Sequence, residues 1–447
     1  MKPKALLIYP PIYDFAAFDL FVKPYALLKI GAWLSAAGYD VSLVNALDYR
    51  DPGSVARLGT PKRRSDGTGK FFRQTIPTPQ ALSFMPRFYS RYGVVEETFT
   101  ARIRAEAPDI VLIGSGMTYW YPGVIETVRR VREAHPRVPI VVGGVYATLC
   151  PDHAHSNTGA DHVAAGPAEY ALPPILSSLE LPVPAGPLPA AQLPCLEGIR
   201  DAAAVRLHRG CPLSCAYCAS RTVSGSFQAG SGEALFEEVA ALHRRFGIRD
   251  FGFYDDALLS HAGSGIIPFL EAVIRSALPL RFHVPNGLHV SLITKEIARL
   301  MKQGGVMNFR LGLESSAASF HEKLDLKVTE ESFRRAVSAL GAAGFRPDEI
   351  AVYILAGLPR QDPEEVEGSV RFAAAFGVRV FIAEYSPIPG SPLWEESVAA
   401  SPFPIAEEPL CQNNTIFPLQ WDRFGPDQMQ RLKDLARSLT RARACAQ

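Results

Sequence analysis

The sequence predicts an α/β protein in which an N-terminal doubly wound domain is followed by a partial (β/α)6 barrel. Short apolar runs alternate with helical patterns along most of the chain, and a proline-rich segment divides this alternation into two parts. The repeat of strand and helix is longer in the second part. At 447 residues with 47% hydrophobic side chains, the chain is long enough for two large domains with ample cores.

Residues 1–180 are predicted to form the doubly wound domain. Strand, helix, strand repeats of this length build a parallel sheet that is covered on both faces. A polar and aromatic insertion at about 48–92 fits no clean period, so we expect a functional loop or a small subdomain there. The predicted strands are Ala5–Tyr9, Val41–Asn45, Asp109–Ser115 and Ile140–Val142, and the predicted helices are Tyr25–Ala37 and Val124–Glu133.

Residues 181–196 are predicted to form a proline-rich linker, because five prolines between Leu181 and Pro194 exclude a helix or a central strand. The barrel is expected over residues 197–395, with a C-terminal extension at 396–447 that is helical from Pro426 to Ala444. The barrel's active site should lie at the carboxyl ends of its strands. Its predicted strands are Ala203–His208, Phe251–Tyr254, Leu280–Val284, Asn308–Leu313, Ile350–Leu355 and Val378–Glu384, and its predicted helices are Ala234–Phe246, Lys295–Lys302, Glu330–Ala343 and Glu364–Phe376.

Charge and hydropathy narrow the range of partners. The 46 Lys and Arg residues almost cancel the 45 Asp and Glu residues, which does not favour nucleic acid as a partner. The apolar run Ala5–Tyr9 is shorter than a signal-peptide core, and no other stretch reaches membrane length. We therefore expect a cytoplasmic protein without a membrane partner. Seven cysteines, an odd number, argue against a disulfide framework.

Three of the cysteines, Cys211, Cys215 and Cys218, lie within eight residues at the predicted end of the first barrel strand. Thiolates at this spacing can converge on one metal centre from a single loop. Three ligands leave a tetrahedral or cubane site one ligand short. The sequence therefore predicts a metal centre with one open coordination position.

The pattern Cys-x3-Cys-x2-Cys, with the aromatic Tyr217 before the last cysteine, resembles the signature of radical S-adenosylmethionine (SAM) enzymes. The resemblance implies that Cys211, Cys215 and Cys218 hold a 4Fe-4S cluster whose fourth iron chelates the amino and carboxylate groups of SAM. One electron then breaks a sulfur–carbon bond and releases a 5′-deoxyadenosyl radical that abstracts hydrogen from a substrate. We expect an external electron donor such as flavodoxin or ferredoxin.

A zinc knuckle is the alternative interpretation, with His208 as the fourth ligand three residues ahead of Cys211. Structural zinc usually takes paired Cys-x2-Cys elements from separate turns, whereas this segment is one short loop. Three unrelated core cysteines are favoured still less, because the interposed Pro, Ser and Ala form an exposed turn.

Further predicted strand ends resemble the SAM-binding positions of the same superfamily. Asp255 lies in a segment that resembles an acidic turn beside the methionyl amino group, with helix capping as its alternative role. Glu314 and Ser315 resemble residues that meet the ribose or methionyl group, and a polar triplet after a strand faces the active-site mouth. Gly357 follows the fifth predicted strand, where the backbone of related enzymes lies against adenine. A plain turn is the alternative reason for a glycine at this position. Tyr217 completes the predicted SAM site.

Residues 108–118, 140–148 and 161–169 resemble the cobalamin-binding domain that precedes many radical SAM barrels. Small residues at strand ends leave room for a large flat cofactor, and any doubly wound fold also needs them for tight turns. Proteins that ligate cobalamin through a side chain carry Asp-x-His-x-x-Gly after the first strand, but Tyr9–Asp14 contains no histidine. We expect cobalamin without a histidine ligand. The candidate cobalamin-binding residues are Ser115, Met117, Thr118, Gly143 and Gly144.

The resemblance implies a cobalamin-dependent radical SAM enzyme that methylates an unactivated carbon of a small-molecule or peptide substrate. No catalytic residue is assigned. Ring formation or rearrangement without methyl transfer is the alternative on the same scaffold, and a non-catalytic, metal-stabilised binding protein is the alternative from another class. The four remaining cysteines are dispersed, which argues against an auxiliary cluster.

Overall fold

The protein was analysed as a computed structural model that describes residues 2–189, 201–325 and 327–444. Contacts within the chain divide it into two compact units. The first comprises Met1–Asp201, Thr222–Gly225 and Ala406–Gln412, and the second comprises the remaining segments. The predicted linker at 181–196 forms no helix or strand up to residue 189, and its remainder lies outside the described residues. The domain boundaries drawn from the sequence remain predictions.

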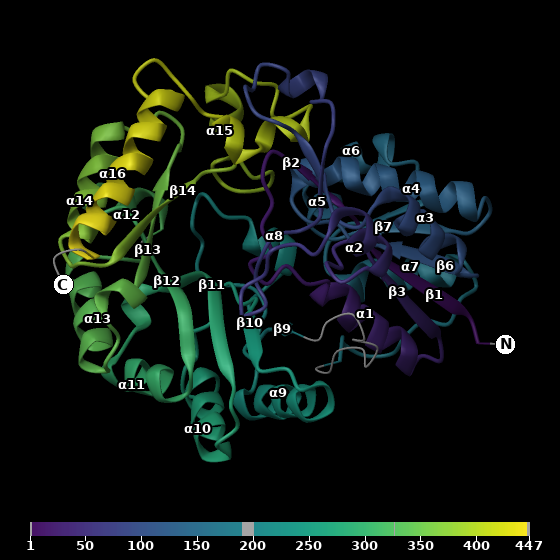
Figure 1. Cartoon of the computed structure of the whole chain (residues 1–447), viewed down its shortest axis with the longest axis horizontal. Helices are drawn as coiled ribbons and strands as arrows, with labels where there is room; N and C mark the ends of the chain where they lie inside the picture. Colours follow the sequence, from purple (N-terminus) through teal and green to yellow (C-terminus); the bar gives the residue numbers. More distant parts are fainter. Residues whose placement is uncertain (1, 190–200, 326, 445–447) are drawn as a thin grey trace. The chain divides into compact units, whose positions relative to one another are not determined.

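The first unit contains a five-stranded parallel sheet in the order β3-β1-β6-β7-β8 (Figure 1). Alternate residues of β1 enter opposite cores, with Leu7 on one face and Leu6 on the other, so the sheet is buried on both sides as a doubly wound fold requires. Helices α1 and α7 cover one face, and α3 to α6 cover the other. The strands are β1 (Lys4–Tyr9), β3 (Asp40–Asn45), β6 (Ile110–Ile113), β7 (Ile140–Gly143) and β8 (His162–Ala164), and the helices are α1 (Tyr25–Ala36), α3 (Glu96–Arg104), α4 (Tyr121–Ala134), α5 (Val145–Leu149), α6 (Pro151–Asn157) and α7 (Ala168–Ser178).

The insertion at about 48–92 forms a small subdomain. It contains helix α2 (Pro52–Leu58), which begins after Asp51, whose carboxylate accepts a hydrogen bond from the Ser54 amide. Its strands β4 (Arg73–Thr75) and β5 (Ser90–Tyr92) join β2 (Ile12–Asp14) in an antiparallel sheet in the order β2-β5-β4. Arg91 is buried and paired with Glu126, so this part of the insertion is a packed element rather than a solvated loop.

The second unit contains a six-stranded parallel sheet in the order β14-β13-β12-β11-β10-β9. Strands β9 and β14 are not paired, so the barrel is partial, as predicted. Helices α9, α10, α11, α13 and α14 follow its outer side (Figure 1). The strands are β9 (Ala202–Val205), β10 (Asp250–Phe253), β11 (Arg281–His289), β12 (Val306–Glu314), β13 (Ala351–Ala356) and β14 (Arg379–Glu384). The helices are α9 (Gly232–Phe246), α10 (Ile266–Ser276), α11 (Lys295–Gln303), α12 (Ala318–Leu324), α13 (Glu330–Ala342), α14 (Pro363–Ala374), α15 (Trp394–Ala400) and α16 (Pro426–Ala444), and the short helix α8 (Ser220–Ser224) is divided between the two units.

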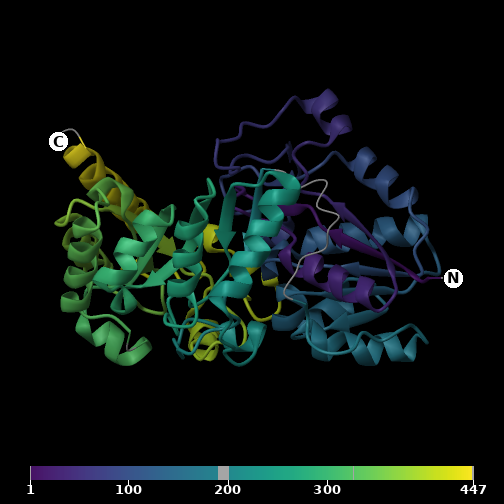
Figure 2. The same cartoon turned by 90° about the horizontal axis from the view of Figure 1, so that it is seen from below.

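Local sequence signals explain where several of these helices begin and end. Ser231 caps α9 through a hydrogen bond from the Ala234 amide, and Gly247 ends it in a left-handed conformation. Helix α16 packs against α14 and beside the edge strand β14. It can be followed in yellow toward the C-terminus in Figure 2. Within the described part of the chain, no helix is both long and apolar enough to cross a membrane.

The first barrel strand is shorter than predicted. It ends at Val205 rather than His208, because the amides of Leu207 and His208 donate to the carboxylate of Asp255 instead of to a neighbouring strand. Strand β11 is longer than predicted and continues past irregular pairing between Val284 and Gly287.

Candidate functional site

The three clustered cysteines lie on one irregular loop, residues 206–219, which we call the cysteine loop and which follows β9. Cys211 and Cys215 are partly buried, and Cys218 is exposed. Backbone amides point at two of the sulfurs: Leu213 N lies 3.5 Å from Cys211 Sγ, and Ser220 N lies 3.4 Å from Cys218 Sγ. Burial raises the pKa of all three thiols, that of Cys215 to about 11. The loop therefore presents sulfur ligands together with amide donors that stabilise negative charge on them.

Asp255 holds the start of the cysteine loop. It follows β10, is 3% exposed, and accepts hydrogen bonds from Leu207 N at 3.0 Å and His208 N at 2.6 Å. Burial raises the pKa of this carboxyl to about 7, although the two amides act in the opposite direction. Because both oxygens receive backbone amides, the structure gives Asp255 a role in shaping the loop. It does not cap a helix, and its contact with SAM remains a prediction.

The middle of the cysteine loop is fixed by groups that follow other strands. Ala216 donates to Leu324 O at 2.7 Å and accepts from Leu393 N at 3.0 Å. The Tyr217 hydroxyl donates to Asp325 Oδ2 at 2.7 Å, while Asp325 Oδ1 lies 2.7 Å from His321 Nδ1. Hydrogen bonds of this kind, made by buried groups, restrict the loop to one conformation.

Glu314, the last residue of β12, lies in the same part of the unit. Its backbone has a φ of 63°, a left-handed conformation that is uncommon for a residue other than glycine. Its carboxylate pairs with Lys327 at 2.9 Å, and both side chains are largely buried. Burial alone would lower the pKa of Lys327, but Glu314, Cys215 and Asp325 raise it above the ordinary value. Lys327 is therefore a permanent cation beside the thiols.

Ser315 and Gly357 make local contacts. Ser315 is buried, and its hydroxyl donates to Glu365 at 3.0 Å. Gly357 has a φ of 94°, and an added Cβ would lie 2.8 Å from the ring of Phe417. The glycine thus permits the close approach of an aromatic ring of the chain itself. The prediction that its backbone also meets adenine stays a prediction.

The zinc-knuckle interpretation requires His208 as a fourth ligand. Among the described residues, no three His, Cys, Asp or Glu side chains, the three clustered cysteines included, are arranged to hold a single metal ion, so this observation does not separate zinc from a cluster. His208 is buried in the core, where its Nδ1 accepts the amide of Gly230 at 3.0 Å. It is therefore engaged by the backbone rather than placed as a fourth ligand.

In the first unit, the structure brings Ser115, Gly143 and Gly144 together at the carboxyl ends of β6 and β7. The Ser115 hydroxyl donates to Gly143 O at 2.6 Å. Gly144 has a φ of 96°, and an added Cβ would lie 2.5 Å from Ser115 O. Glycine is required here because the two loops lie against each other. On the same loop Met117 is 49% exposed, and Thr118 is buried.

Sequence reasoning missed Asp325, His321 and Lys327. They lie beyond β12, and Asp325 reaches Tyr217 across 108 positions of the chain. The spacing of His321 and Asp325, four residues apart at the end of a short helix, was the available local signal. Only the fold shows that they face the cysteine loop.

Family models match two parts of the chain. The B12 binding domain model matches residues 89–176, and the radical SAM superfamily model matches residues 205–373. The first match covers β6, β7 and the loops that carry Ser115, Gly143 and Gly144. The second begins at the end of β9 and includes the cysteine loop.

Three curated relatives resemble the chain. An uncharacterized methyltransferase of Pyrococcus horikoshii is 26% identical and covers 51% of this chain and 46% of its own length. An anaerobic magnesium-protoporphyrin IX monomethyl ester cyclase of Synechocystis is 24% identical, covering 50% of this chain and 51% of its own length. Hopanoid C-3 methylase of Methylococcus capsulatus is 24% identical, and the match covers 88% of this chain and 72% of the methylase. The chain spans about half the length of the first two relatives.

Among solved structures, the chain is similar to TsrM from Kitasatospora setae, a radical SAM methyltransferase with cobalamin and a [4Fe-4S] cluster bound. The TM-score is 0.68 at 16% identity, and the match covers 98% of this chain and 89% of TsrM. At this identity the similarity concerns the fold. The two family matches show that the chain contains a B12 binding domain followed by a radical SAM domain.

Proposed function

We propose that this protein is a cobalamin-dependent radical SAM methyltransferase that acts on an unactivated carbon. The observation that carries the proposal is the cysteine loop at the carboxyl end of β9, in a chain that also contains a B12 binding domain. We assign Cys211, Cys215 and Cys218 as the ligands of a 4Fe-4S cluster. The runner-up, a radical SAM cyclase, is favoured by the similarity to the Synechocystis cyclase.

The donor set of the second unit fits such a cluster. Three sulfurs from one loop leave one iron free for SAM, amides lie near two of the sulfurs, and Lys327 offsets negative charge. Tyr217, Asp255, Glu314, Ser315 and Gly357 remain our candidates for the surrounding SAM site. When bound, the cluster supplies the electron that cleaves SAM, and cobalamin supplies a carrier for the methyl group.

Two glycines at the ends of strands in the first unit have no close neighbour where a side chain would begin. A Cβ added to Gly143 would meet nothing closer than 3.6 Å, and one added to Gly166, after β8, would meet nothing within 4 Å. Both positions are at the carboxyl edge of a doubly wound sheet, where such folds bind ligands. Residues 9–14 contain no histidine, so we propose cobalamin without a histidine ligand. Ser115, Met117, Thr118, Gly143 and Gly144 are the residues that we assign to it.

The chain's own residues hold the reacting groups in place. Asp255 fixes the first turn of the cysteine loop, and Tyr217 fixes its end through Asp325. The Lys327–Glu314 ion pair places a buried cation and a buried carboxylate beside the loop. Groups held this way are pre-organised, which lowers the cost of orienting a substrate.

The test is anaerobic reconstitution with iron, sulfide and cobalamin, followed by incubation with SAM labelled with 13C on its methyl group and a low-potential reductant. The proposal predicts that the label moves to cobalamin and that the Cys215→Ala variant forms no 5′-deoxyadenosine. Formation of 5′-deoxyadenosine without any label on cobalamin would instead support the cyclase.

A further inference from the structure

The inner face of the barrel carries two arginines in one row. Arg310 on β12 pairs in register with Ala351 on β13, and Ala351 pairs with Arg379 on β14. Residues in register across neighbouring strands project from the same face, so the two arginines are separated by two strand spacings, about 10 Å between Cα atoms. On the other side of Arg310 the register partner is Gly287. The register neighbours on both sides of Arg310 are thus small residues.

Two aromatic side chains, on β13 and β14, lie two residues further along the strands. Gly312, Tyr353 and Phe381 are in register there. The guanidinium carbon of Arg310 lies 5.6 Å from the centre of the Tyr353 ring, and that of Arg379 lies 5.9 Å from the centre of the Phe381 ring. Phe381 is 41% exposed, which is unusual for a large apolar side chain. Each cation is therefore combined with an aromatic surface.

Neither arginine forms an ion pair within the described part of the chain, although Asp348 lies close enough to Arg379 to favour its charged form. The Nε atoms of Arg310 and Arg379 are buried without a hydrogen-bond partner. Burial and the nearby Arg310 lower the pKa of Arg379 below the ordinary value. By contrast, Arg281 on β11 pairs with Asp250. The Nε of Arg281 is buried without a hydrogen-bond partner as well, so it is the lack of an ion pair at both partly buried arginines, in one row of the described sheet, that points to an anion.

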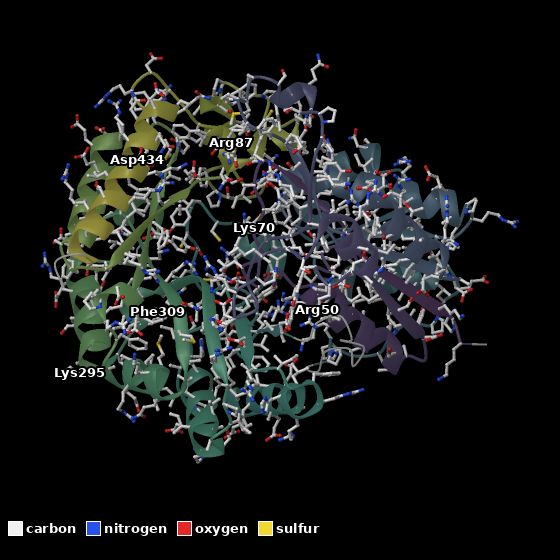
Figure 3. All side chains as sticks on the ribbon, in the orientation of Figure 1. Arg50, Lys70, Arg87, Lys295, Phe309 and Asp434 are labelled. Carbon is white, nitrogen blue, oxygen red and sulfur yellow. The ribbon has the colours of Figure 1, made fainter. Side chains whose placement is uncertain are left out.

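A cavity of about 430 Å³ opens next to this row, lined by β14 and α16. Arg379 and Phe381 line it, together with Lys433 and Arg437 of α16. Lys433 is neutralised by Glu384, and Arg437 by Asp434. Asp434 is labelled on α16 in Figure 3, which also labels Phe309 on β12. Among the described residues, Arg379 is thus the cavity-lining cation that forms no ion pair.

The arginine row lies on the face of the sheet against which the cysteine loop packs. Leu355, four residues beyond Ala351 on β13, packs in one cluster with Tyr217. Because residues two apart on a strand share a face, Ala351 and Leu355 project to the same side. Four residues of strand span about 13 Å. The row lies at the amino ends of β13 and β14, so a ligand whose anionic end meets the arginines must extend along the strands to reach the cysteine loop at the carboxyl ends.

We propose that Arg310 and Arg379 bind the anionic group, a carboxylate or a phosphate, of a substrate whose flat or apolar body lies on Tyr353 and Phe381. This inference rests on the proposed function, for which it names the substrate class. Guanidinium groups suit the task because they form bidentate, charge-assisted hydrogen bonds with carboxylate and phosphate. The aromatic rings add apolar contact area next to the anion.

The test measures binding of three probes with one ring system to the reconstituted full-length protein by calorimetry: 2-naphthoate, 2-naphthyl phosphate and neutral 2-naphthamide. We expect at least one anionic probe to bind about tenfold or more tightly than the amide. Arg310→Met and Arg379→Met should each weaken that anion about tenfold or more and leave the amide within about twofold. Arg371→Met is the matched control, because Arg371 is exposed and paired with Glu367 on the same helix.

The preferred anion distinguishes a carboxylate from a phosphate substrate, and either preference supports the site. Equal affinity for the amide and both anions would overturn the proposal, as would anion affinities that do not change in both arginine variants. Arg310→Lys keeps a charge but loses the bidentate geometry, so an intermediate affinity in a folded variant supports the assignment. SAM cleavage is measured separately in the same preparations. Anion binding without SAM cleavage would therefore count against the proposed function and not against this site.

Discussion

The hydroxyl of Tyr217 donates a 2.7 Å hydrogen bond to Asp325 Oδ2, which joins the cysteine loop to the segment that follows α12. Asp325 also accepts the amide of Lys327 and contacts His321, so this one carboxylate organises three neighbours. The conformation of the cysteine loop thus depends on residues that lie a hundred positions away in the chain.

Removing this hydrogen bond should loosen the loop. Tyr217→Phe is expected to lower the free energy of unfolding by about 1–2 kcal/mol, and Asp325→Asn by about 2–3 kcal/mol because it disturbs more partners. Both variants should hold less iron per chain after anaerobic reconstitution. Urea unfolding and iron analysis measure the two effects. Tyr170→Phe is the control, since Tyr170 is 70% exposed, and an equal loss of iron in that variant would contradict the assignment.

Lys327 neutralises Glu314 in a buried pair, so removing the cation leaves an unpaired carboxylate. Lys327→Met is expected to lower the free energy of unfolding by about 3 kcal/mol. Lys323→Met, on the exposed side of α12, should change it by less than about 0.5 kcal/mol. Denaturant titration of the two variants provides the comparison. Equal stability of Lys327→Met and the wild type would show that the ion pair is not needed.

The carboxyl of Asp255 should make stability depend on pH. Burial raises its pKa to about 7, whereas an aspartate in an unfolded chain titrates near about 3.9. Between these values the folded protein holds a proton that the unfolded chain has released, so this group destabilises the fold as pH rises from about 4 to about 7. Asp255→Asn should remove this part of the pH dependence. Unfolding curves at several pH values test it, and identical profiles for variant and wild type would refute it.

Alanine substitutions at Gly144 and Gly38 distinguish the cost of backbone strain from the cost of steric overlap. Both have positive φ, but an added Cβ at Gly144 meets the backbone of Ser115, whereas one at Gly38 meets nothing within 4 Å. Gly38→Ala is expected to cost about 1 kcal/mol, the cost of the left-handed conformation alone. Gly144→Ala should cost about 3 kcal/mol or more and should reduce the amount of cobalamin retained. Thermal unfolding and cobalamin absorbance measure both. Equal costs would show that the contact with Ser115 relaxes easily.

Much of the fold could be predicted from periodicity. The four strands predicted for the first unit's parallel sheet and the helix Pro426–Ala444 agree with the structure within one or two residues, because apolar runs and regular helical patterns dominate them, whereas β8 was not predicted. Helix α10 was missed, since it lacks a side-chain cap and has Pro268 in its first turn. The three-residue strands β2, β4 and β5 are too short to show a period.

The site was predictable only where it is local in sequence. The three cysteines lie within eight residues, so their clustering is visible in the sequence. Glu314 could be identified as a candidate because it lies at a predicted strand end. The contacts that shape the loop are long-range: Asp255 to His208 and Asp325 to Tyr217. The register of β12 to β14, which brings Arg310 and Arg379 into one row, is likewise a property of the folded sheet. No pattern in a single segment reports such contacts.

Electron paramagnetic resonance of the reduced, anaerobically reconstituted protein, with and without SAM, tests directly whether the cysteine loop holds a cluster with one open iron. A cluster of this kind predicts about four irons per chain and a reduced-cluster signal that changes when SAM is added. Single alanine substitutions at Cys211, Cys215 or Cys218 should abolish that signal, while Cys150→Ala, in the first unit, should retain it. A signal that does not change when SAM is added, or that persists in the three cysteine variants, would contradict the assignment of these cysteines to a cluster that binds SAM.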